Sequence, residues 1–257
     1  MQRINKNTAS GNAIIDRVLA LAWSTSENRY EGALYYGLID NQSRTTLIGL
    51  FLAEQNGLCC YCLKEIGPDD VAIEHIIPQG ATQQEINKYI TVQELSNSLI
   101  HKDLFIRTVY TIPPIRYPHD LCYNNLIASC VSTSHCNHER GKKYISPIMY
   151  DTGLINALSY EPSGSIFTTA AQIDALKLNN DFLKMVRKLW FLISKKIQNL
   201  IGINHATDLQ PIVDEIIANE SLIFIETFSG ETSKVSEVYK YKWFYDYYRT
   251  NYPIATR

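Results

Sequence analysis

The sequence predicts an α+β fold, in which a small β-containing core lies between two mainly helical regions. Three observations support this prediction: apolar residues recur at helical spacing near both ends of the chain, short β-branched segments occupy the middle, and the cysteines gather there in two groups. We expect a helical region over residues 1–56, a cysteine-rich core over residues 57–148 with an insertion near 80–117, and a mainly helical region over residues 149–257.

Two helices are expected in the N-terminal region. Apolar residues have helical spacing from Ala13 to Trp23 and again from Thr45 to Gln55. Gly57 follows the second pattern, and glycine readily adopts the left-handed conformation that is common just past a helix end. We therefore expect the second helix to stop before Gly57, close to the first cysteines.

The segment Leu58–Pro78 is predicted to form a turn, a short strand, a second turn and a second short strand. CCYC has the form of a tight knuckle, GPDD is typical of a turn, and VAIEHII is β-branched and apolar around two polar residues. From Gly80 to Tyr117 the composition is polar and then mixed, and the stretch YTIPPIRYPHD contains prolines that disfavour regular structure. We interpret this part as an insertion or a lid.

The C-terminal region is predicted to begin with a small hairpin and to continue as helices. YEPSGSIFT has the pattern of a hairpin with Gly164 at its tip, and a long helical pattern runs from about Thr169 to Ile201. A further helix is expected at Leu209–Asn219. The aromatic and basic tail YKYKWFYDYYRTNYP has two interpretations: a base-stacking surface, or, preferred here, an aromatic element that packs on the domain.

Composition sets limits on the class of protein. The formal net charge is -2, so nothing in the total charge points to nucleic acid, and any DNA-binding surface must be local. The N-terminus lacks the basic region, apolar core and cleavage site of a secretory signal, and no apolar run approaches membrane-spanning length. We therefore expect a cytoplasmic protein with no membrane partner.

The cysteine spacing predicts a structural zinc site. In a reducing cytoplasm the six cysteines are not expected to form a disulfide framework. Cys59-x-x-Cys62 and Cys130-x5-Cys136 supply four thiolates, and each short loop can turn two sulfurs toward one tetrahedral ion. A closed set of four cysteines leaves no position for a reactive water, so this zinc would be structural.

The second half of the zinc site is the less regular one, because a five-residue gap is wider than a usual knuckle. His135 lies beside Cys136 and is the first alternative ligand, and Cys60 and Cys122 are weaker alternatives. Buried free thiols that pack as small apolar groups are the remaining interpretation of the six cysteines.

An acid–histidine pair lies between the two cysteine groups. Glu74 and His75 occur in the segment IEHIIP, and neighbouring residues on a regular strand point to opposite faces. Taken alone, such a pair is more often structural than catalytic. The order of motifs along the chain changes this assessment: CxxC, an acid followed by His-Ile-x-Pro, Asn-Leu, and then Cys-Asn with a basic Gly-Lys.

In this order of motifs, residues 57–143 resemble the zinc-knuckle branch of the HNH nuclease family. The resemblance implies a ββα-metal fold, in which two strands and a helix surround one divalent ion and zinc knuckles hold the ends of the unit. It also implies that His75 is the general base and that Glu74 replaces the usual aspartate as an oxygen ligand of the catalytic ion. Two features differ from a compact unit: the long gap after His75 and the wide spacing from Cys130 to Cys136.

The resemblance assigns the remaining positions to asparagines. Asn125, in Asn-Leu, matches the middle asparagine that orients the loop and the histidine, with Asn124 as an adjacent competitor. Asn137 directly follows the last cysteine and matches the final metal-ligand position, although a shift of one residue would place His138 there instead.

These residue types suit the hydrolysis of a phosphodiester. A neutral imidazole can take a proton from water near pH 7, and oxygen ligands suit a hard catalytic ion such as Mg²⁺ or Mn²⁺. Arg140, Lys142 and Lys143 fall on the helix expected after Asn137, where they could hold the DNA backbone; a solvated helix face is the equal alternative.

The flanking sequence narrows the resemblance. TLIGLFLAEQNGLCCYC before the core, and YEPSGSIFT with IDALKLNNDFLKMVRKLW after it, look like the HNH subunit of Septu-type anti-phage systems, an effector family that also accompanies some retrons. This implies a DNA endonuclease, with RNA as an open alternative, that works beside an ABC-type ATPase. A retron reverse transcriptase and its RNA–DNA product are further implied partners, and the C-terminal helices would be the docking surface. The chain has no Walker motif of its own.

Two other classes of function are weighed against the nuclease. A catalytically inactive, zinc-stabilised module that binds nucleic acid or protein would keep the cysteines without needing His75 or Asn137, and both residues are present. A thiol redox enzyme would place its CxxC at the start of a helix in a βαβ unit, a context that this sequence lacks. We therefore expect a metal-dependent HNH endonuclease, with weak activity when the chain is isolated from its partner.

Overall fold

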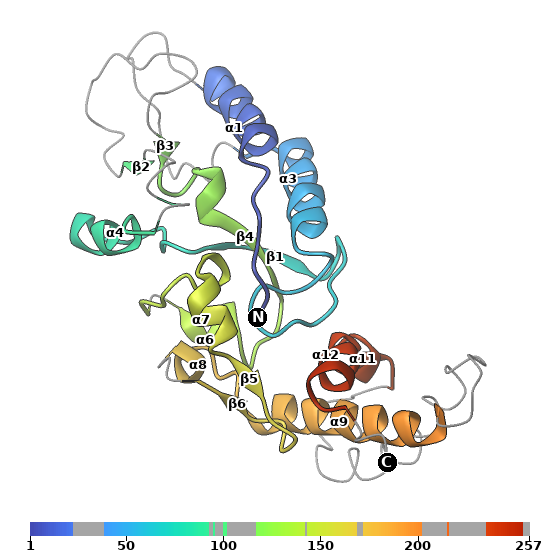
Figure 1. Ribbon diagram of the computed structural model, residues 1–257. Helices are drawn as coiled ribbons and strands as arrows, with labels where there is room; N and C mark the ends of the chain where they lie inside the picture. Colours follow the sequence, from blue (N-terminus) through green and yellow to red (C-terminus); the bar gives the residue numbers. More distant parts are fainter. Residues whose placement is uncertain are drawn as a thin grey trace. The chain divides into compact units, whose positions relative to one another are not determined.

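The computed structural model describes residues 1–22, 39–92, 95, 100–101, 117–141, 143–168, 172–201, 215 and 235–253 (Figure 1). The chain divides into two compact units. The first contains Met1–Tyr61 and Ile66–Asn156, and the second contains Cys62–Glu65 and Ala157–Arg257. Helices and short strands are mixed in both, as the α+β prediction requires, and no helix in the described part is long and apolar enough to cross a membrane.

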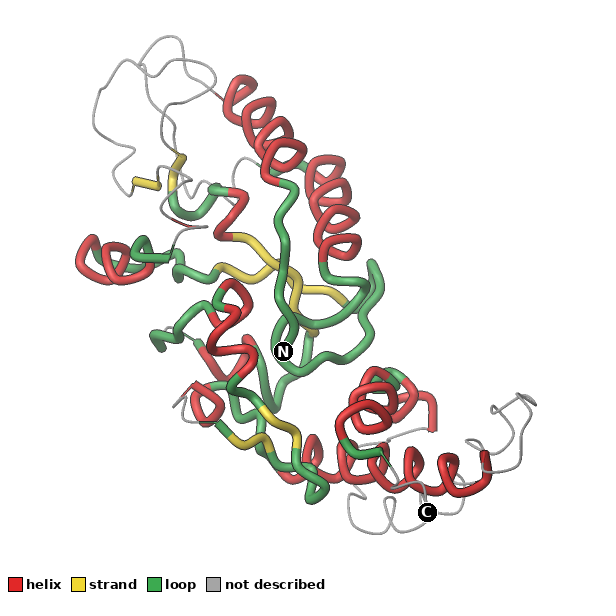
Figure 2. The backbone as a smooth tube through the Cα atoms, viewed as in Figure 1, coloured by secondary structure: helices red, strands yellow, loops and turns green. Residues whose placement is uncertain are grey.

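The first unit begins with two helices, α1 (Thr8–Ala22) and α3 (Asn41–Glu54), which pack against each other (Figure 2). Both begin earlier than predicted. For α3 the reason is Asp40, whose carboxylate accepts a hydrogen bond from the Ser43 backbone N–H at 2.7 Å and so caps the helix. The helix ends at Glu54 with Gln55 as its C-cap, so it stops before Gly57 as predicted. Asn56 and Gly57 both have positive φ, at 53° and 69°, and the Gly57 N–H donates to the Leu52 carbonyl at 2.8 Å.

The central sheet of the first unit has two antiparallel strands, β1 (Val71–His75) and β4 (Leu126–Cys130). Their register pairs Val71 with Cys130 and His75 with Leu126. The prediction of two strands within Leu58–Pro78 is therefore wrong for the first of them. Residues 59–64 form the bent knuckle instead, with Leu63 at a φ of 63°, and the partner of β1 comes from a segment more than forty residues away.

The expected insertion contains one helix in its described part, α4 (Gln83–Tyr89). Thr82 and Glu85 form a reciprocal capping box at its start, a pattern that is readable from the sequence as Thr-x-x-Glu. Two short parallel strands, β2 (Ile100–His101) and β3 (Tyr117–Pro118), pair with each other. Apart from Leu95, the other residues between 93 and 116 lie outside the described part, so the lid interpretation stays a prediction.

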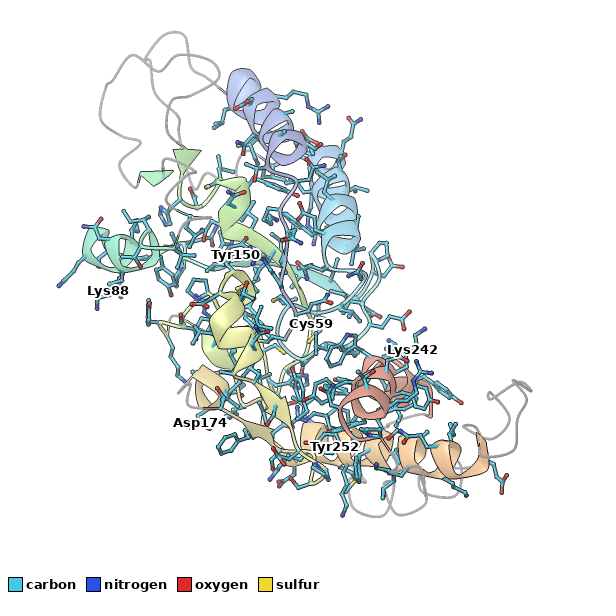
Figure 3. All side chains as sticks on the ribbon, viewed as in Figure 1. Cys59, Lys88, Tyr150, Asp174, Lys242 and Tyr252 are labelled. Atoms are coloured by element: carbon cyan, nitrogen blue, oxygen red, sulfur yellow. The ribbon has the colours of Figure 1, made fainter. Side chains whose placement is uncertain are left out.

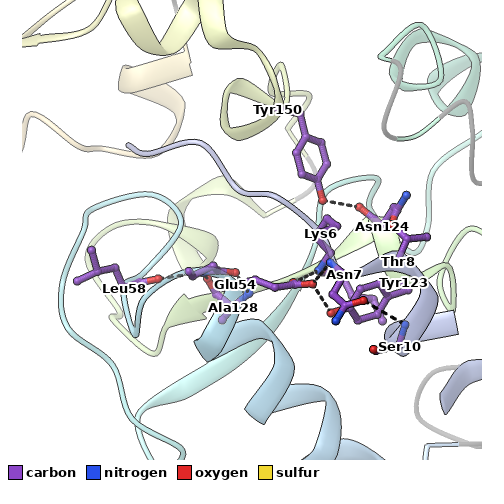
Figure 4. Close-up of polar contacts among 12 residues, drawn as sticks. Lys6, Asn7, Thr8, Ser10, Glu54, Leu58, Tyr123, Asn124, Ala128 and Tyr150 are labelled. Carbon is purple, nitrogen blue, oxygen red and sulfur yellow. Dashed lines mark hydrogen bonds and ion pairs between the residues drawn. The ribbon is translucent and has the colours of Figure 1, made fainter. Parts of the chain in front are cut away.

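The 3₁₀ helix η1 (Tyr123–Asn125) leads directly into β4, and a buried polar cluster surrounds it (Figure 4). Lys6 Nζ pairs with Glu54 at 2.8 Å and donates to the Leu126 carbonyl at 2.9 Å. Tyr123 donates its hydroxyl to Glu54 at 2.7 Å, and its ring lies 3.9 Å from Lys6 Nζ. The N-terminal segment is thereby bonded to the first residue of β4.

Three short helical elements complete the first unit. They are α6 (Asn137–Arg140), η2 (Ile148–Tyr150) and α7 (Thr152–Asn156). The Tyr150 hydroxyl donates to the Asn124 carbonyl at 2.8 Å, so η2 contacts η1.

In the second unit, β5 (Ser159–Tyr160) and β6 (Ile166–Phe167) form the predicted hairpin. Gly164 has a φ of 85°, and a Cβ there would lie 1.8 Å from the Lys184 carbonyl oxygen, so the turn requires glycine. The single helix predicted over 169–201 is wrong: α8 (Gln172–Ala175) and α9 (Asp181–Ile201) are separate. The physical reason is a local cap, because Asn180 Oδ1 accepts a hydrogen bond from the Leu183 N–H at 2.8 Å.

The last helices are α11 (Val235–Tyr239) and α12 (Trp243–Asn251), and α12 packs against α9. The Phe191 and Tyr248 rings lie 5.4 Å apart edge to face, and the Tyr160 and Phe244 rings 5.0 Å apart. These contacts confirm the preferred interpretation of the tail as an aromatic packing element. The helix predicted at 209–219 lies outside the described residues, apart from Glu215.

Candidate metal centre and adjoining acid–histidine site

The four cysteines predicted to share an ion lie together. The sulfurs of Cys59, Cys62, Cys130 and Cys136 are all within 4.8 Å of one another, and all four side chains are buried (Figure 3, where Cys59 is labelled). Cys130 is the last residue of β4, and Cys136 directly precedes α6. The predicted grouping of the two cysteine pairs is therefore confirmed.

The spacing of the sulfurs suits a metal ion better than a disulfide. Cys59 Sγ and Cys136 Sγ are 3.9 Å apart, and none of the six cysteines forms a disulfide. A tetrahedral zinc with Zn–S bonds of about 2.3 Å holds its sulfurs about 3.8 Å apart. The Cys130 backbone N–H also donates to Cys59 Sγ at 3.3 Å, a contact that favours a negatively charged sulfur. The donor set can thus hold a metal such as zinc.

The alternative ligands do not belong to this group in the described part. The Nδ1 of His135 lies 2.8 Å from the Ser132 hydroxyl, which gives this ring a different environment. Cys60 and Cys122 are buried but are not among the four clustered sulfurs. Burial raises the pKa of the Cys60 thiol well above its ordinary value, so this thiol stays protonated.

Glu74 is a buried carboxylate near the end of β1. Its Oε1 forms an ion pair with Arg140 and accepts a hydrogen bond from the Tyr61 hydroxyl at 3.0 Å. Burial raises the pKa of Glu74, while Arg140 and the Tyr61 hydroxyl oppose this shift. Both of these contacts fall on Oε1.

Arg140, the last residue of α6, is 1% exposed. Its terminal nitrogens donate to five groups: the Glu74 carboxylate, the carbonyls of His75 and Ile76, and the hydroxyls of Tyr61 and Tyr89. The expectation that Arg140 contacts nucleic acid is therefore corrected, because its guanidinium points into the protein. Lys142 lies outside the described residues, and Lys143 is exposed, so their contact with nucleic acid stays a prediction.

His75, the last residue of β1, faces a different segment from Glu74. Its Nε2 lies 3.0 Å from the Asp120 carbonyl oxygen. Because a carbonyl only accepts, Nε2 carries the hydrogen of the neutral ring, and Nδ1 is the basic nitrogen. Burial is the main cause that lowers the pKa of His75 to about 4; the hydrogen bond to the Asp120 carbonyl opposes this shift, and the nearby Arg140 guanidinium adds to it. The imidazole is therefore neutral at pH 7.

Asn125 joins two segments next to His75. Its side chain accepts from the Ile77 N–H at 2.6 Å and donates to the carbonyls of Ile77 at 3.1 Å and His119 at 2.5 Å. Asn124 instead accepts from the Thr8 hydroxyl at 2.9 Å, away from this loop. Asn125 therefore bonds to the segments on either side of the His75–Asp120 contact.

The structure places both candidates for the final ligand at the start of α6. Asn137 is its first residue and is half-buried, and the next residue, His138, is exposed. In the described part, the four cysteines are the group of three or more His, Cys, Asp or Glu ligands that could share an ion. The choice between Asn137 and His138 stays a prediction.

Three residues near the site were missed by sequence reasoning: Tyr61, Tyr89 and His119. His119 is buried, and its Nε2 lies 2.9 Å from the Gln79 carbonyl. The only signal was its position in Pro-His-Asp just before the Asn-Asn-Leu motif. The two tyrosines gave no signal, because a tyrosine in a short apolar segment is ordinary core composition.

Comparison with known proteins adds no family assignment. The chain matches no protein-family model, no curated protein and no solved structure.

Proposed function

We propose that this protein is a metal-dependent endonuclease of the HNH type that hydrolyses phosphodiester bonds in DNA. The observation that carries the proposal is the state of His75. It follows the buried Glu74 at the end of β1, it is neutral at pH 7, and its Nε2–H is directed to a carbonyl. A histidine held in this way presents Nδ1 as a general base.

The other residues have roles that follow from their contacts. His75 accepts a proton from the attacking water, and Asn125 holds the loops on either side of the histidine. Glu74 offers Oε2, and Asn137, or else His138, offers a second ligand atom. An ion such as Mg²⁺ or Mn²⁺ bound there would neutralise charge on the phosphate and on the leaving oxygen.

The arrangement of β1, β4 and α6 supports the proposal of a ββα core. The two strands are antiparallel, and Arg140 connects α6 to the end of β1. Cys130 ends β4 and Cys136 precedes α6, so a structural zinc would fix the strand and the helix to the knuckle. Lys143, which is exposed after α6, is a candidate contact for the nucleic-acid backbone.

The proposed biological setting rests on the sequence resemblance alone. We place the protein as the effector nuclease of an anti-phage system, with an ABC-type ATPase as its partner. A retron reverse transcriptase with its RNA–DNA product is the further partner of this setting.

One observation favours a second candidate function, an inactive zinc-stabilised module that binds nucleic acid or protein. Glu74, the proposed metal ligand, already has its charge compensated by Arg140. A carboxylate that is paired with a guanidinium attracts a cation less strongly than an unpaired one.

Cleavage of supercoiled plasmid in Mg²⁺ or Mn²⁺ tests the two candidates. Wild type and His75→Ala are compared with and without the co-expressed ATPase, at equal zinc content, and Arg44→Ala on the exposed face of α3 is the control. The nuclease proposal expects cleavage by wild type and by Arg44→Ala, and a loss of about a hundredfold or more in His75→Ala. Equal cleavage by His75→Ala, or none by any protein, would leave the binding module as the better candidate.

A further inference from the structure

Arg140 connects four parts of the first unit through one buried side chain. The guanidinium starts from α6 and reaches the end of β1 through Glu74 and the His75 carbonyl. It also reaches the knuckle through the Tyr61 hydroxyl at 3.3 Å and α4 through the Tyr89 hydroxyl at 3.2 Å. Arg140 is 1% exposed, so its guanidinium makes these contacts inside the protein.

The chemistry of the contact set is specific to arginine. The planar guanidinium has five N–H groups in a fixed fork, so it can donate to the Glu74 carboxylate and to the His75 and Ile76 carbonyls from one position. A lysine ammonium has three donors at a single point and cannot reach the same set together. The contacts to the two carbonyls hold the backbone at His75 and Ile76 in place.

We propose that Arg140 is a positioning residue of the acid–histidine site. It holds Glu74 through Oε1 so that Oε2 serves the ion, and it holds the His75–Ile76 backbone. This inference rests on the proposed nuclease function and assigns Arg140 a role different from the nucleic-acid contact that its sequence position suggested. The Tyr61 hydroxyl has the same effect on a smaller scale, because it also donates to Glu74 Oε1, at 3.0 Å.

An arginine that contacts DNA and an arginine that only stabilises the fold would each give a different experimental result. An arginine that contacts the DNA backbone changes KM and the salt dependence of binding, and leaves kcat nearly unchanged. An arginine that only stabilises the fold changes the melting temperature, but leaves metal affinity and kcat unchanged well below it. A positioning residue lowers kcat and metal affinity in the folded protein.

The test uses the full chain with its zinc, with its ATPase where cleavage needs it, and the variants Arg140→Lys and Arg44→Lys. Arg44 is an exposed arginine of α3, so its variant is the matched control. Mn²⁺ affinity is measured from the EPR signal of free Mn²⁺, and plasmid cleavage gives kcat and KM. We expect Arg140→Lys to bind Mn²⁺ about tenfold more weakly and to lose about a hundredfold in kcat, with KM changed less than about threefold. Arg44→Lys should match wild type.

Each outcome of this experiment has a distinct meaning. If wild type binds Mn²⁺ and cleaves, while Arg140→Lys does both within about twofold, the positioning role is overturned and the nuclease function stands. A raised KM with unchanged kcat overturns it as well, in favour of a substrate contact. If wild type neither binds Mn²⁺ nor cleaves, the proposed function is wrong, and the positioning role of Arg140 is wrong as well.

A second variant covers the case in which Arg140→Lys does not fold. Tyr61→Phe removes only a hydroxyl and leaves the buried ion pair of Glu74 and Arg140 in place. We expect about threefold to tenfold weaker Mn²⁺ binding, because Glu74 Oε1 loses one of its two donors. Unchanged Mn²⁺ affinity and kcat in a folded Tyr61→Phe would overturn the inference.

Discussion

The two buried clusters of the candidate site differ in how their charge is balanced. The cysteine cluster brings four sulfurs within 4.8 Å of one another, and as thiolates these groups repel. The Glu74 cluster brings a carboxylate to a guanidinium and two tyrosine hydroxyls, so opposite charges and donors come from the chain itself. As thiolates, the sulfurs of the first cluster would need an ion that the chain does not supply, whereas the carboxylate of the second has its counter-charge within the polypeptide.

This difference predicts different responses to the loss of one component. Removing the ion from the cysteine cluster leaves four groups without a common partner. Removing Arg140 leaves one buried charge without its counter-charge, while the rest of the packing is unchanged.

Removal of the metal is expected to unfold the core of the first unit. Structural zinc contributes about 10–16 kcal/mol in small zinc-binding peptides, which is comparable with the whole stability of a typical domain. Chelation at neutral pH should therefore expose the β1–β4 backbone to hydrogen exchange, and Cys59→Ser should be isolated without zinc.

The matched control for this prediction is Cys122→Ser, since Cys122 is buried but lies outside the four clustered sulfurs. It should keep one zinc per chain. Full protection of β1 and β4 in a zinc-free protein would show that the cysteine cluster, like the Glu74 cluster, is complete without an ion.

Breaking the Glu74–Arg140 pair from one side is expected to be the second largest effect. Both side chains are buried, so Arg140→Met leaves Glu74 uncompensated and should destabilise the protein by about 3–5 kcal/mol. Glu74→Gln leaves Arg140 uncompensated and should have a similar cost. The double variant should be less destabilised than the sum of the two, which a cycle of urea unfolding experiments measures. Strict additivity would mean that the pair contributes nothing as a pair.

Asn125→Ala tests a neutral part of the same region. The asparagine makes three side-chain hydrogen bonds to backbone groups of Ile77 and His119, all buried. Their loss should cost about 3 kcal/mol in the free energy of unfolding, at about 1 kcal/mol for each bond. Asn124→Ala is the matched comparison, because its side chain accepts a hydrogen bond from Thr8 at a part-buried position, and its loss should cost about 1 kcal/mol. Equal losses of unfolding free energy in both variants would show that Asn125 contributes no more to stability than Asn124.

The sequence predicted those features that depend on residue type and short spacing. Cys59-x-x-Cys62 has the spacing of a knuckle, and glycines 57 and 164 occupy positions with positive φ. The separation of α8 from α9 could also have been read, because Asn180 directly precedes α9 as a capping residue would. Local signals of this kind carry their own physical explanation.

The features that the sequence did not predict depend on distant contacts. Arg140 pairs with Glu74 across 66 residues, and nothing near Arg140 distinguishes a buried guanidinium from one that faces solvent. Strand β4 was missed for a similar reason: LIASC is a short apolar run, and such runs do not separate a buried strand from other buried segments. Only the fold brings these partners together.

The Lys6–Glu54 pair tests how a buried charge is balanced through a gradual change of stability with pH. Lys6 is buried against Glu54 and the rings of Phe51 and Tyr123, and burial lowers its pKa from 10.5 to about 8. Between these two values the folded protein binds fewer protons than the unfolded chain, so the cost of burying the ammonium is present below the folded pKa and is relieved as the pH rises. From about pH 7 to about pH 9, this should stabilise wild type relative to Lys6→Met by about 1.4 kcal/mol. Lys88→Met, on the exposed face of α4, should show no such change. If the difference in unfolding free energy between wild type and Lys6→Met does not change with pH, then Glu54 compensates the charge of Lys6 and offsets the cost of its burial.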